Sequence, residues 1–299
     1  MPTNDPKPSK NQRRDEAREK ARQLRIAQER KAKRTRIAVI VVGAVALVAL
    51  GLVVAFIMKQ NSDKAEQYAN VAYGGGGSDV VAPATADVTA PSTADGNFIP
   101  VSKDGVGKAA AGGSATLSIY FDLQCPICAQ FDSINGADLD ALAKEDGITV
   151  KYFPVSFLDS ASNGTHYSNR AANAASIVAD KDPEHFSPFI TKLYEQQPAE
   201  NTDGLTDEKI AEIATEAGVP SSVSDTFTDT VDGTYKVEGS DAEKKGTWRT
   251  FAPWIAANTG LTDKIDKFGT PYVLINDTKF ENWSTPGALK TAVEAAAKG

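Results

Sequence analysis

Cysteine is almost absent from this chain: its 299 residues include two, Cys125 and Cys128, both within "YFDLQCPICAQF". Because there is no third cysteine, neither residue can form a structural disulfide with a distant part of the chain. A disulfide between residues so close together closes a very short loop, and stabilisation by a disulfide grows with loop length. The spacing therefore favours a bond that is made and broken during function, or half of a metal site.

Histidine is equally scarce, and His166 and His185 lie 19 residues apart. A structural zinc site needs four ligands, usually two cysteine pairs or one pair with two closely spaced histidines. Since the chain has neither arrangement, we expect no metal, and we expect both histidines to be ordinary surface or hydrogen-bonded residues. Redox chemistry at the cysteine pair is favoured over a purely structural disulfide.

Long uncharged runs are rare too, but the 22 residues from Ile37 to Met58 carry no charge. This length is sufficient for a helix to cross a hydrocarbon core of about 30 Å. A cleaved signal peptide has a shorter apolar core and a small-residue cleavage site, whereas "MKQNSDKAEQ" follows this run. Residues 1–36 contain 13 basic and five acidic residues. We therefore predict a single-pass anchor with a cytoplasmic N-terminus and an extracytoplasmic remainder.

The basic segment, residues 1–36, contains no aromatic residue, which argues against nucleic-acid binding. We interpret it as solvated topogenic charge. Residues 59–97 include "YGGGGSDV" and "VAPATADVTAPSTADG", which have too few apolar side chains to form a core. They are predicted to be a flexible linker that carries a folded domain, residues 98–299.

The folded domain begins with a pattern typical of a βαβ unit. "ATLSIYFD", Ala115 to Asp122, alternates between apolar and polar residues and is predicted to be a strand. A helix is expected to follow, with Pro126 at its first position and its end near Gly147. "ITVKYFPVSF", Ile148 to Phe157, is the second expected strand.

A mostly helical insertion is predicted at about residues 162–268, because apolar residues recur there at helical spacing. "TPYVLIND", Thr270 to Asp277, is a nearly continuous apolar run, as expected of a strand buried on both faces. "TKFENW" is expected to pair beside it as a hairpin. A final helix is predicted with Thr285 as its N-cap and Pro286 at its first position.

The two cysteines are expected to differ in chemistry. At the start of a helix, unpaired backbone N–H groups and the helix dipole stabilise a thiolate, which lowers the thiol pKa. Cys125 occupies that position and is predicted to be the nucleophile. Cys128 lies one turn further into the helix, where it would be shielded and would act as the resolving thiol.

The motifs "FDLQCPIC" and "FGTPYVLIND", separated by a helical insertion, resemble the DsbA-like thiol–disulfide oxidoreductases of the thioredoxin fold. The resemblance covers about residues 98–299 and implies a mixed α/β fold. It also implies that Pro271 follows a cis peptide bond and that Thr270 lies beside the cysteine pair. The best-known oxidants of this family have histidine where this chain has Ile127, so weaker oxidising power is expected. Asp122 could assist proton transfer or simply end its strand.

The resemblance implies a disulfide oxidase that acts on reduced exported proteins and is reoxidised by a membrane-embedded, quinone-linked enzyme. The redox couple would be Cys125–Cys128 itself, so no bound cofactor is expected, and we expect a monomer. A reductase or isomerase of the same fold is one alternative, motivated by Ile127 and Thr270. Another is a tethered binding module in which the disulfide is inert.

Overall fold

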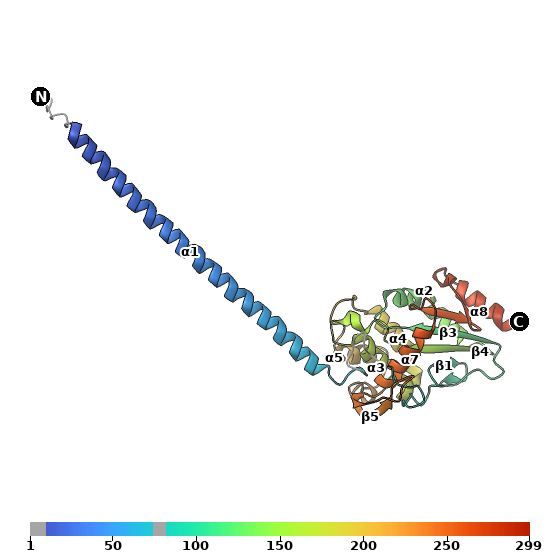
Figure 1. Cartoon of the computed structure of the whole chain (residues 1–299). Coiled ribbons are helices and arrows are strands. Elements are labelled where there is room, and N and C mark those ends of the chain that lie inside the picture. Colours follow the sequence, from blue (N-terminus) through green and yellow to red (C-terminus); the bar gives the residue numbers. More distant parts are fainter. Residues whose placement is uncertain (1–9, 74–81) are drawn as a thin grey trace. The chain divides into compact units, whose positions relative to one another are not determined.

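The computed structural model describes residues 10–73 and 82–299, and the chain divides into two compact units at Asp63 and Lys64. The first unit is a single helix, α1 (Lys10–Gln67), which continues for four residues into the second unit (Figure 1). Its length and composition would allow it to cross a membrane, and it contains the predicted anchor Ile37 to Met58. The predicted basic segment is helical from Lys10 onward.

The second unit is built around a six-stranded mixed sheet with the order β2-β1-β4-β3-β7-β8. The central strands β3 and β4 are parallel, which requires the helical crossover that the sequence pattern predicted. β1, β7 and β8 each run antiparallel to their neighbours. The strands span Ile99–Ser102 (β1), Gly105–Val106 (β2), Ala115–Phe121 (β3), Ile148–Pro154 (β4), Tyr272–Ile275 (β7) and Thr278–Lys279 (β8).

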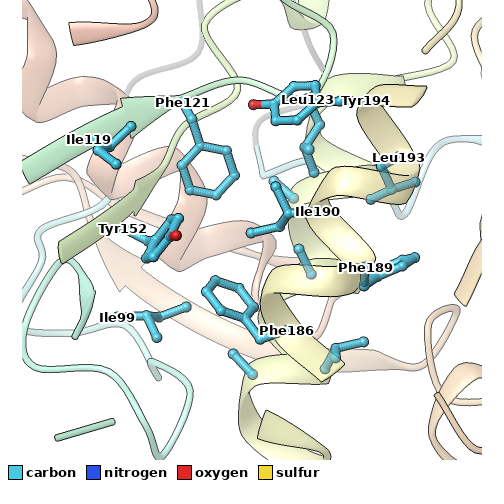
Figure 2. Packing of buried hydrophobic residues seen from close by; sticks show 14 of the residues in the cluster. Ile99, Ile119, Phe121, Leu123, Tyr152, Phe186, Phe189, Ile190, Leu193 and Tyr194 are labelled. Carbon is cyan, nitrogen blue, oxygen red and sulfur yellow. The ribbon is translucent and has the colours of Figure 1, made fainter. Parts of the chain in front are cut away.

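Helices α2 (Pro126–Leu142) and α8 (Ala288–Lys298) lie next to each other and pack against the sheet (Figure 1). α4 (Phe186–Glu195) packs beside α2 and turns its apolar side toward the sheet (Figure 2). Phe186 makes an edge-on contact with Tyr152 at 5.4 Å between ring centroids. The spacing of Phe186, Phe189, Ile190 and Leu193 places all four on this buried face, as predicted.

The insertion between β4 and β7 is helical except for one hairpin, which the sequence pattern did not predict. The hairpin, β5 (Thr230–Lys236) with β6 (Glu243–Arg249), forms a separate two-stranded sheet. Its strands are largely exposed, so no apolar run signalled them. The helices of the insertion are α3 (Tyr167–Lys181), α4, α5 (Asp207–Glu216), α6 (Ser221–Ser224) and α7 (Ala252–Leu261).

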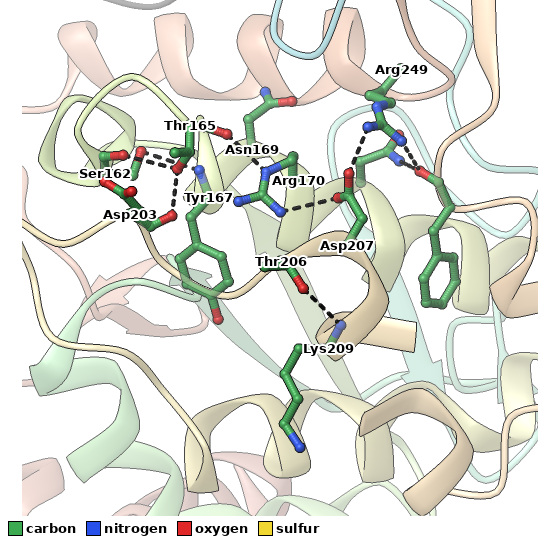
Figure 3. A network of polar contacts seen from close by, with 12 residues as sticks. Ser162, Thr165, Tyr167, Asn169, Arg170, Asp203, Thr206, Asp207, Lys209 and Arg249 are labelled. Atoms are coloured by element: carbon green, nitrogen blue, oxygen red, sulfur yellow. Dashed lines mark hydrogen bonds and ion pairs between the residues drawn. The ribbon is translucent and has the colours of Figure 1, made fainter. Parts of the chain in front are cut away.

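An ion-pair network ties this insertion together (Figure 3). Asp207, at the start of α5, accepts from Arg170 of α3 at 3.1 Å and from Arg249 of β6 at 2.9 Å. Arg249 also donates to the carbonyl of Phe227. Because both guanidinium groups are buried, the shared carboxylate compensates their desolvation and fixes α3, α5 and the hairpin relative to one another.

The prediction of a flexible linker over residues 59–97 is wrong wherever the structure describes that segment. α1 continues to Gln67, and Val71 and Tyr73 are buried. Tyr73 packs against Trp248 of the hairpin, with ring centroids 4.8 Å apart. The carbonyl of Gly96 accepts a hydrogen bond from the Trp254 indole. These contacts join residues far apart in sequence, so the low apolar content of the segment concealed them. "GGGGS" lies in 74–81, outside the described residues.

Several predicted boundaries also move. The helix after Pro126 ends at Leu142 rather than near Gly147, and the second strand ends at Pro154. β7 is shorter than predicted, and within it Val273 alone is fully buried, so it is not covered on both faces. The C-terminal helix begins at Ala288 with Gly287 as its N-cap. Thr285 and Pro286 therefore precede the helix, and the Thr285 hydroxyl donates to Asn282 in the preceding turn.

Candidate active site

Cys125 is the N-cap residue of α2, directly after the turn that follows β3. Its backbone is extended, and Pro126 is the first helical residue, as predicted. The carbonyl of Cys125 accepts the first helical hydrogen bonds, from the N–H groups of Cys128 at 3.0 Å and Ala129 at 3.2 Å. The thiol of Cys125 therefore lies at the positive end of the helix, where unpaired N–H groups can stabilise a negative charge.

The surroundings of Cys125 favour its thiolate. Its pKa is lowered to about 6, first by a hydrogen bond from the Cys128 thiol and then by one from the Thr270 side chain. The backbone N–H groups of Cys128 and Ile127 act in the same direction, while burial opposes them. A cysteine with this pKa is largely thiolate at neutral pH and can attack a disulfide or leave one.

Cys128 is buried even more deeply than Cys125, and its environment has the opposite effect. Burial raises the pKa of Cys128 well above its ordinary value, and the neighbouring Cys125 raises it further. Cys128 therefore keeps its proton and shares it with Cys125. Both cysteines are free thiols in this structure, so the geometry is that of the reduced pair.

Thr270 and Pro271 lie beside the cysteines, and the peptide bond between them is cis, as expected. β7 pairs with β3 so that Tyr272 is opposite Tyr120, which brings the preceding residues next to the start of α2. The thiol of Cys125 donates to the carbonyl oxygen of Thr270 at 3.2 Å. Two motifs that are 145 residues apart in sequence thus form one site.

Asp122 is completely buried and connects three segments around the cysteines. Its carboxylate accepts hydrogen bonds from the backbone N–H of Gln124 at 2.8 Å, that of Leu158 at 2.7 Å, and the Ser168 hydroxyl at 2.7 Å. Burial raises its pKa to about 7, despite these three donors. Asp122 therefore does more than end the strand, because it also holds the β3–α2 turn, the segment after β4 and α3 together.

Two further residues were not predicted from the sequence: Ser168, which donates to Asp122, and Gln197, whose side-chain amide contacts the carbonyl of Cys125 at 3.1 Å. Both residues belong to the helical insertion, and neither lies in a motif that identifies its role. Ser168 is next to Tyr167, and both are buried residues of α3. Periodicity can assign such a residue to a helix, but it cannot identify the residues that face it across the structure.

Exposed apolar side chains lie near the site residues in the sequence. Ile127 is 47% exposed and Phe157 is 46% exposed. Phe157 contacts Phe268 edge-on at 5.4 Å, and Phe268 in turn contacts Tyr120 at 5.8 Å. Since the Ile127 side chain has no hydrogen-bond donor, its backbone N–H is its only polar contribution to the Cys125 thiolate.

The two histidines lie in different polar groups. His166 is buried and contacts Asp159 at 2.6 Å. His185 contacts Asp182 at 2.8 Å. Together with Glu184 these residues form a group whose potential metal-ligand atoms lie within 4.8 Å of one another. Both histidines therefore have protein hydrogen-bond partners, in agreement with the interpretation from the sequence.

Comparison with known proteins identifies the family. A family model described as thioredoxin matches residues 105–295, which is well over half of the chain. This chain belongs to the thioredoxin family. The match includes both cysteines and the Thr270–Pro271 bond.

Two solved structures place this thioredoxin-family chain near the DsbA-type members. It is 30% identical to oxidised DsbA of Mycobacterium tuberculosis, with a TM-score of 0.51, and the match covers 68% of this chain and 93% of the other. It is 29% identical to the reduced form of the disulfide bond oxidoreductase DsbG of the same organism, with a TM-score of 0.50 and coverage of 69% and 95%. The predicted DsbA-like thioredoxin fold is therefore confirmed.

Of two further relatives, one is named for disulfide bond formation and the other is a protein kinase. The thioredoxin-family chain is 24% identical over 184 residues to Disulfide bond formation protein D of Bacillus subtilis, which covers 62% of this chain and 73% of that protein. It is 33% identical over 147 residues to the serine/threonine-protein kinase PknE of Mycobacterium tuberculosis. That match covers 48% of this chain, which spans about a quarter of the kinase's length (26%).

Proposed function

We propose that this protein is a membrane-tethered thiol–disulfide oxidase that donates the Cys125–Cys128 disulfide to reduced exported proteins. The observation that carries the proposal is the opposite pKa shift of the two thiols, with Cys125 at the start of α2 beside Thr270. The likeness to DsbA, to a disulfide bond oxidoreductase and to a disulfide bond formation protein supports the same chemistry.

The reaction is a pair of thiol–disulfide exchanges. A substrate thiolate attacks Sγ of Cys125 in the enzyme disulfide, the S–S bond breaks, and Cys128 leaves with the electron pair and takes up a proton. A second substrate thiolate then attacks the substrate sulfur of the mixed disulfide and expels Cys125 as a thiolate. The substrate gains a disulfide and loses two electrons, and the enzyme becomes a dithiol.

The direction of transfer follows from the stability of the leaving thiolate. A thiol of low pKa leaves readily, and stabilising the reduced form makes the pair a stronger oxidant. The helix terminus, Cys128 and Thr270 stabilise the Cys125 thiolate even though residue 127 is isoleucine. In this proposal Asp122 exchanges protons with the pair, because its carboxyl has a pKa near neutrality and Cys125 contributes to that shift.

The proposal also includes the location of the protein and the way in which it is reoxidised. The anchor Ile37 to Met58 would leave the basic segment in the cytoplasm and hold the catalytic unit outside, where disulfides persist. A membrane-embedded enzyme would reoxidise the dithiol. The cysteine pair is itself the redox group, so the reaction needs no bound cofactor.

A reductase or isomerase is the second candidate, and Ile127 is the observation that favours it. An oxidase has a reduction potential near about −120 to −180 mV, whereas a reductant lies near about −270 mV. The full chain in detergent, titrated in glutathione buffers, would distinguish these values. A pair that does not exchange with glutathione at all would instead indicate an inert disulfide in a binding module.

The direct test is oxidative refolding of a reduced disulfide-containing protein by the oxidised full chain. We expect stoichiometric transfer of one disulfide per enzyme, and we expect Cys125→Ala to reduce the rate to that of the buffer alone. If Cys125→Ala refolds the substrate as fast as the unmodified chain, the proposed function is wrong.

A further inference from the structure

The turn between β3 and α2 has backbone carbonyl groups that α2 itself cannot satisfy. Leu123 precedes the N-cap residue Cys125, so its carbonyl lies outside the hydrogen-bond ladder of α2, and Leu123 is completely buried. A buried carbonyl without a donor costs about 1–3 kcal/mol. A donor must therefore come from another element.

Gln197 supplies that donor. Its Nε2 donates to the carbonyl of Leu123 at 2.9 Å and to the carbonyl of Cys125 at 3.1 Å. An amide nitrogen carries two hydrogens, so one Gln197 side chain can satisfy both oxygens at once. Among the hydrogen bonds of the described residues, the carbonyl of Leu123 accepts only this one.

Gln197 is held in place by the end of α4. Its backbone N–H donates to the carbonyl of Tyr194 at 3.2 Å, and its side chain is half-buried. The Tyr194 hydroxyl itself lies 3.4 Å from the carbonyl of Asp122, in the same turn. The C-terminal end of α4, within the helical insertion, therefore contacts three carbonyls of the segment that carries the nucleophile.

We propose that Gln197 is a positioning residue whose amide holds the Cys125 backbone so that Sγ stays at the N-terminus of α2, beside Thr270. The carbonyl of Cys125 already accepts from Cys128 and Ala129, and the amide of Gln197 is its third donor. Without it, the buried carbonyl of Leu123 has no donor, so the turn would have to shift to find one, and Sγ of Cys125 would move away from the N–H groups of Ile127 and Cys128.

This inference rests on the proposed redox role of Cys125, but its test does not require turnover. The pH dependence of alkylation of the reduced full chain by iodoacetamide reports the pKa of Cys125, because the thiolate is the reactive form. The test variant is Gln197→Met, which keeps the length of the side chain and removes both N–H donors. The matched control is Gln196→Met, because Gln196 is equally half-buried and donates to Glu216 instead.

We expect Gln197→Met to raise the pKa of Cys125 by about half to one unit, a three- to tenfold loss of thiolate below that pKa. Gln196→Met should leave the profile unchanged. Gln197→Ala also removes the donors and adds no apolar side chain to the site. It should raise the pKa of Cys125 by the same amount, which would show that the effect does not depend on how methionine packs.

A profile unchanged in both Gln197 variants would overturn the inference, even if their unfolding temperature falls, because the residue would then be merely structural. A rise of equal size in Gln196→Met would overturn it as well. Failure of the unmodified chain to transfer disulfides would contradict the proposed function instead, and would leave the pKa comparison intact.

Discussion

Two cysteines that lie one helical turn apart at the start of α2 have pKa values shifted in opposite directions. Cys125 lies at the helix terminus among several donors, and its pKa falls to about 6. Cys128, three residues later, is enclosed by the core and its pKa is raised well above the ordinary value. One helical turn, about 5.4 Å, separates a position where charge is stabilised from one where burial excludes it. In the proposed function, this difference makes Cys125 the nucleophile and leaving group and Cys128 its protonated partner.

The largest effect is expected from removing the buried member of the pair. Cys128→Ala leaves the chain without the Cys125–Cys128 disulfide, so transfer of a disulfide to a reduced substrate should fall to the rate of the buffer alone. The Cys125 thiolate can still attack a disulfide-bonded peptide, but no second thiol of the chain can then resolve the mixed disulfide. Covalent adducts with a disulfide-bonded peptide, measured by mass spectrometry, should therefore accumulate in this variant. Their formation in Cys125→Ala would show that the roles of the two cysteines have been assigned wrongly.

An intermediate effect is expected at Asp122, the buried acid beside the pair. The folded chain keeps this proton up to about pH 7, whereas the unfolded chain releases it near the ordinary aspartate pKa of 3.8. The free energy of unfolding should therefore fall as pH rises between these values, by about 4 kcal/mol in total. The measurement is urea unfolding of the full chain at a series of pH values. Asp122→Asn should remove this part of the decrease in unfolding free energy with pH.

The control for that experiment is Asp266→Asn, since Asp266 is exposed. It should show the same slope as the unmodified chain. Loss of a hydrogen bond in Asp122→Asn lowers stability equally at every pH, so the slope alone is diagnostic. Identical slopes in Asp122→Asn and the unmodified chain would mean that this carboxyl is ionised in the folded state.

The smallest effect is expected from adding a donor at the exposed rim. Ile127→His should lower the pKa of Cys125 by about half a unit, because an imidazolium near the thiolate adds a favourable charge. The reduction potential should become less negative, which would enlarge the difference between the two thiols. Ile127→Leu is the matched control and should change neither quantity. If Ile127→His leaves the pKa unchanged, the helix terminus and Thr270 already stabilise the thiolate fully.

Much of the catalytic core followed from local patterns. The alternation of Leu117, Ile119 and Phe121 predicted β3, and Pro126 predicted the start of α2, because both features depend on neighbouring residues alone. The pairing of the two motifs at Cys125 and Thr270 came from the family resemblance. The hairpin β5–β6 was missed, because its strands are largely exposed and their buried side chains, Tyr235 and Trp248, pack against Tyr73, which lies far earlier in the chain.

The sequence by itself determined which thiols can react with each other, where the uncharged helix lies, and that a strand leads directly into the helix bearing Cys125. These properties depend on residue identity and short-range spacing. The tertiary structure alone decided that the predicted linker is packed, that Asp122 is buried among three donors, and that Gln197 reaches the nucleophile from 72 residues away. Such contacts are set by how separate elements pack, and hydrogen-bond partners across that distance leave no periodic signal in the chain.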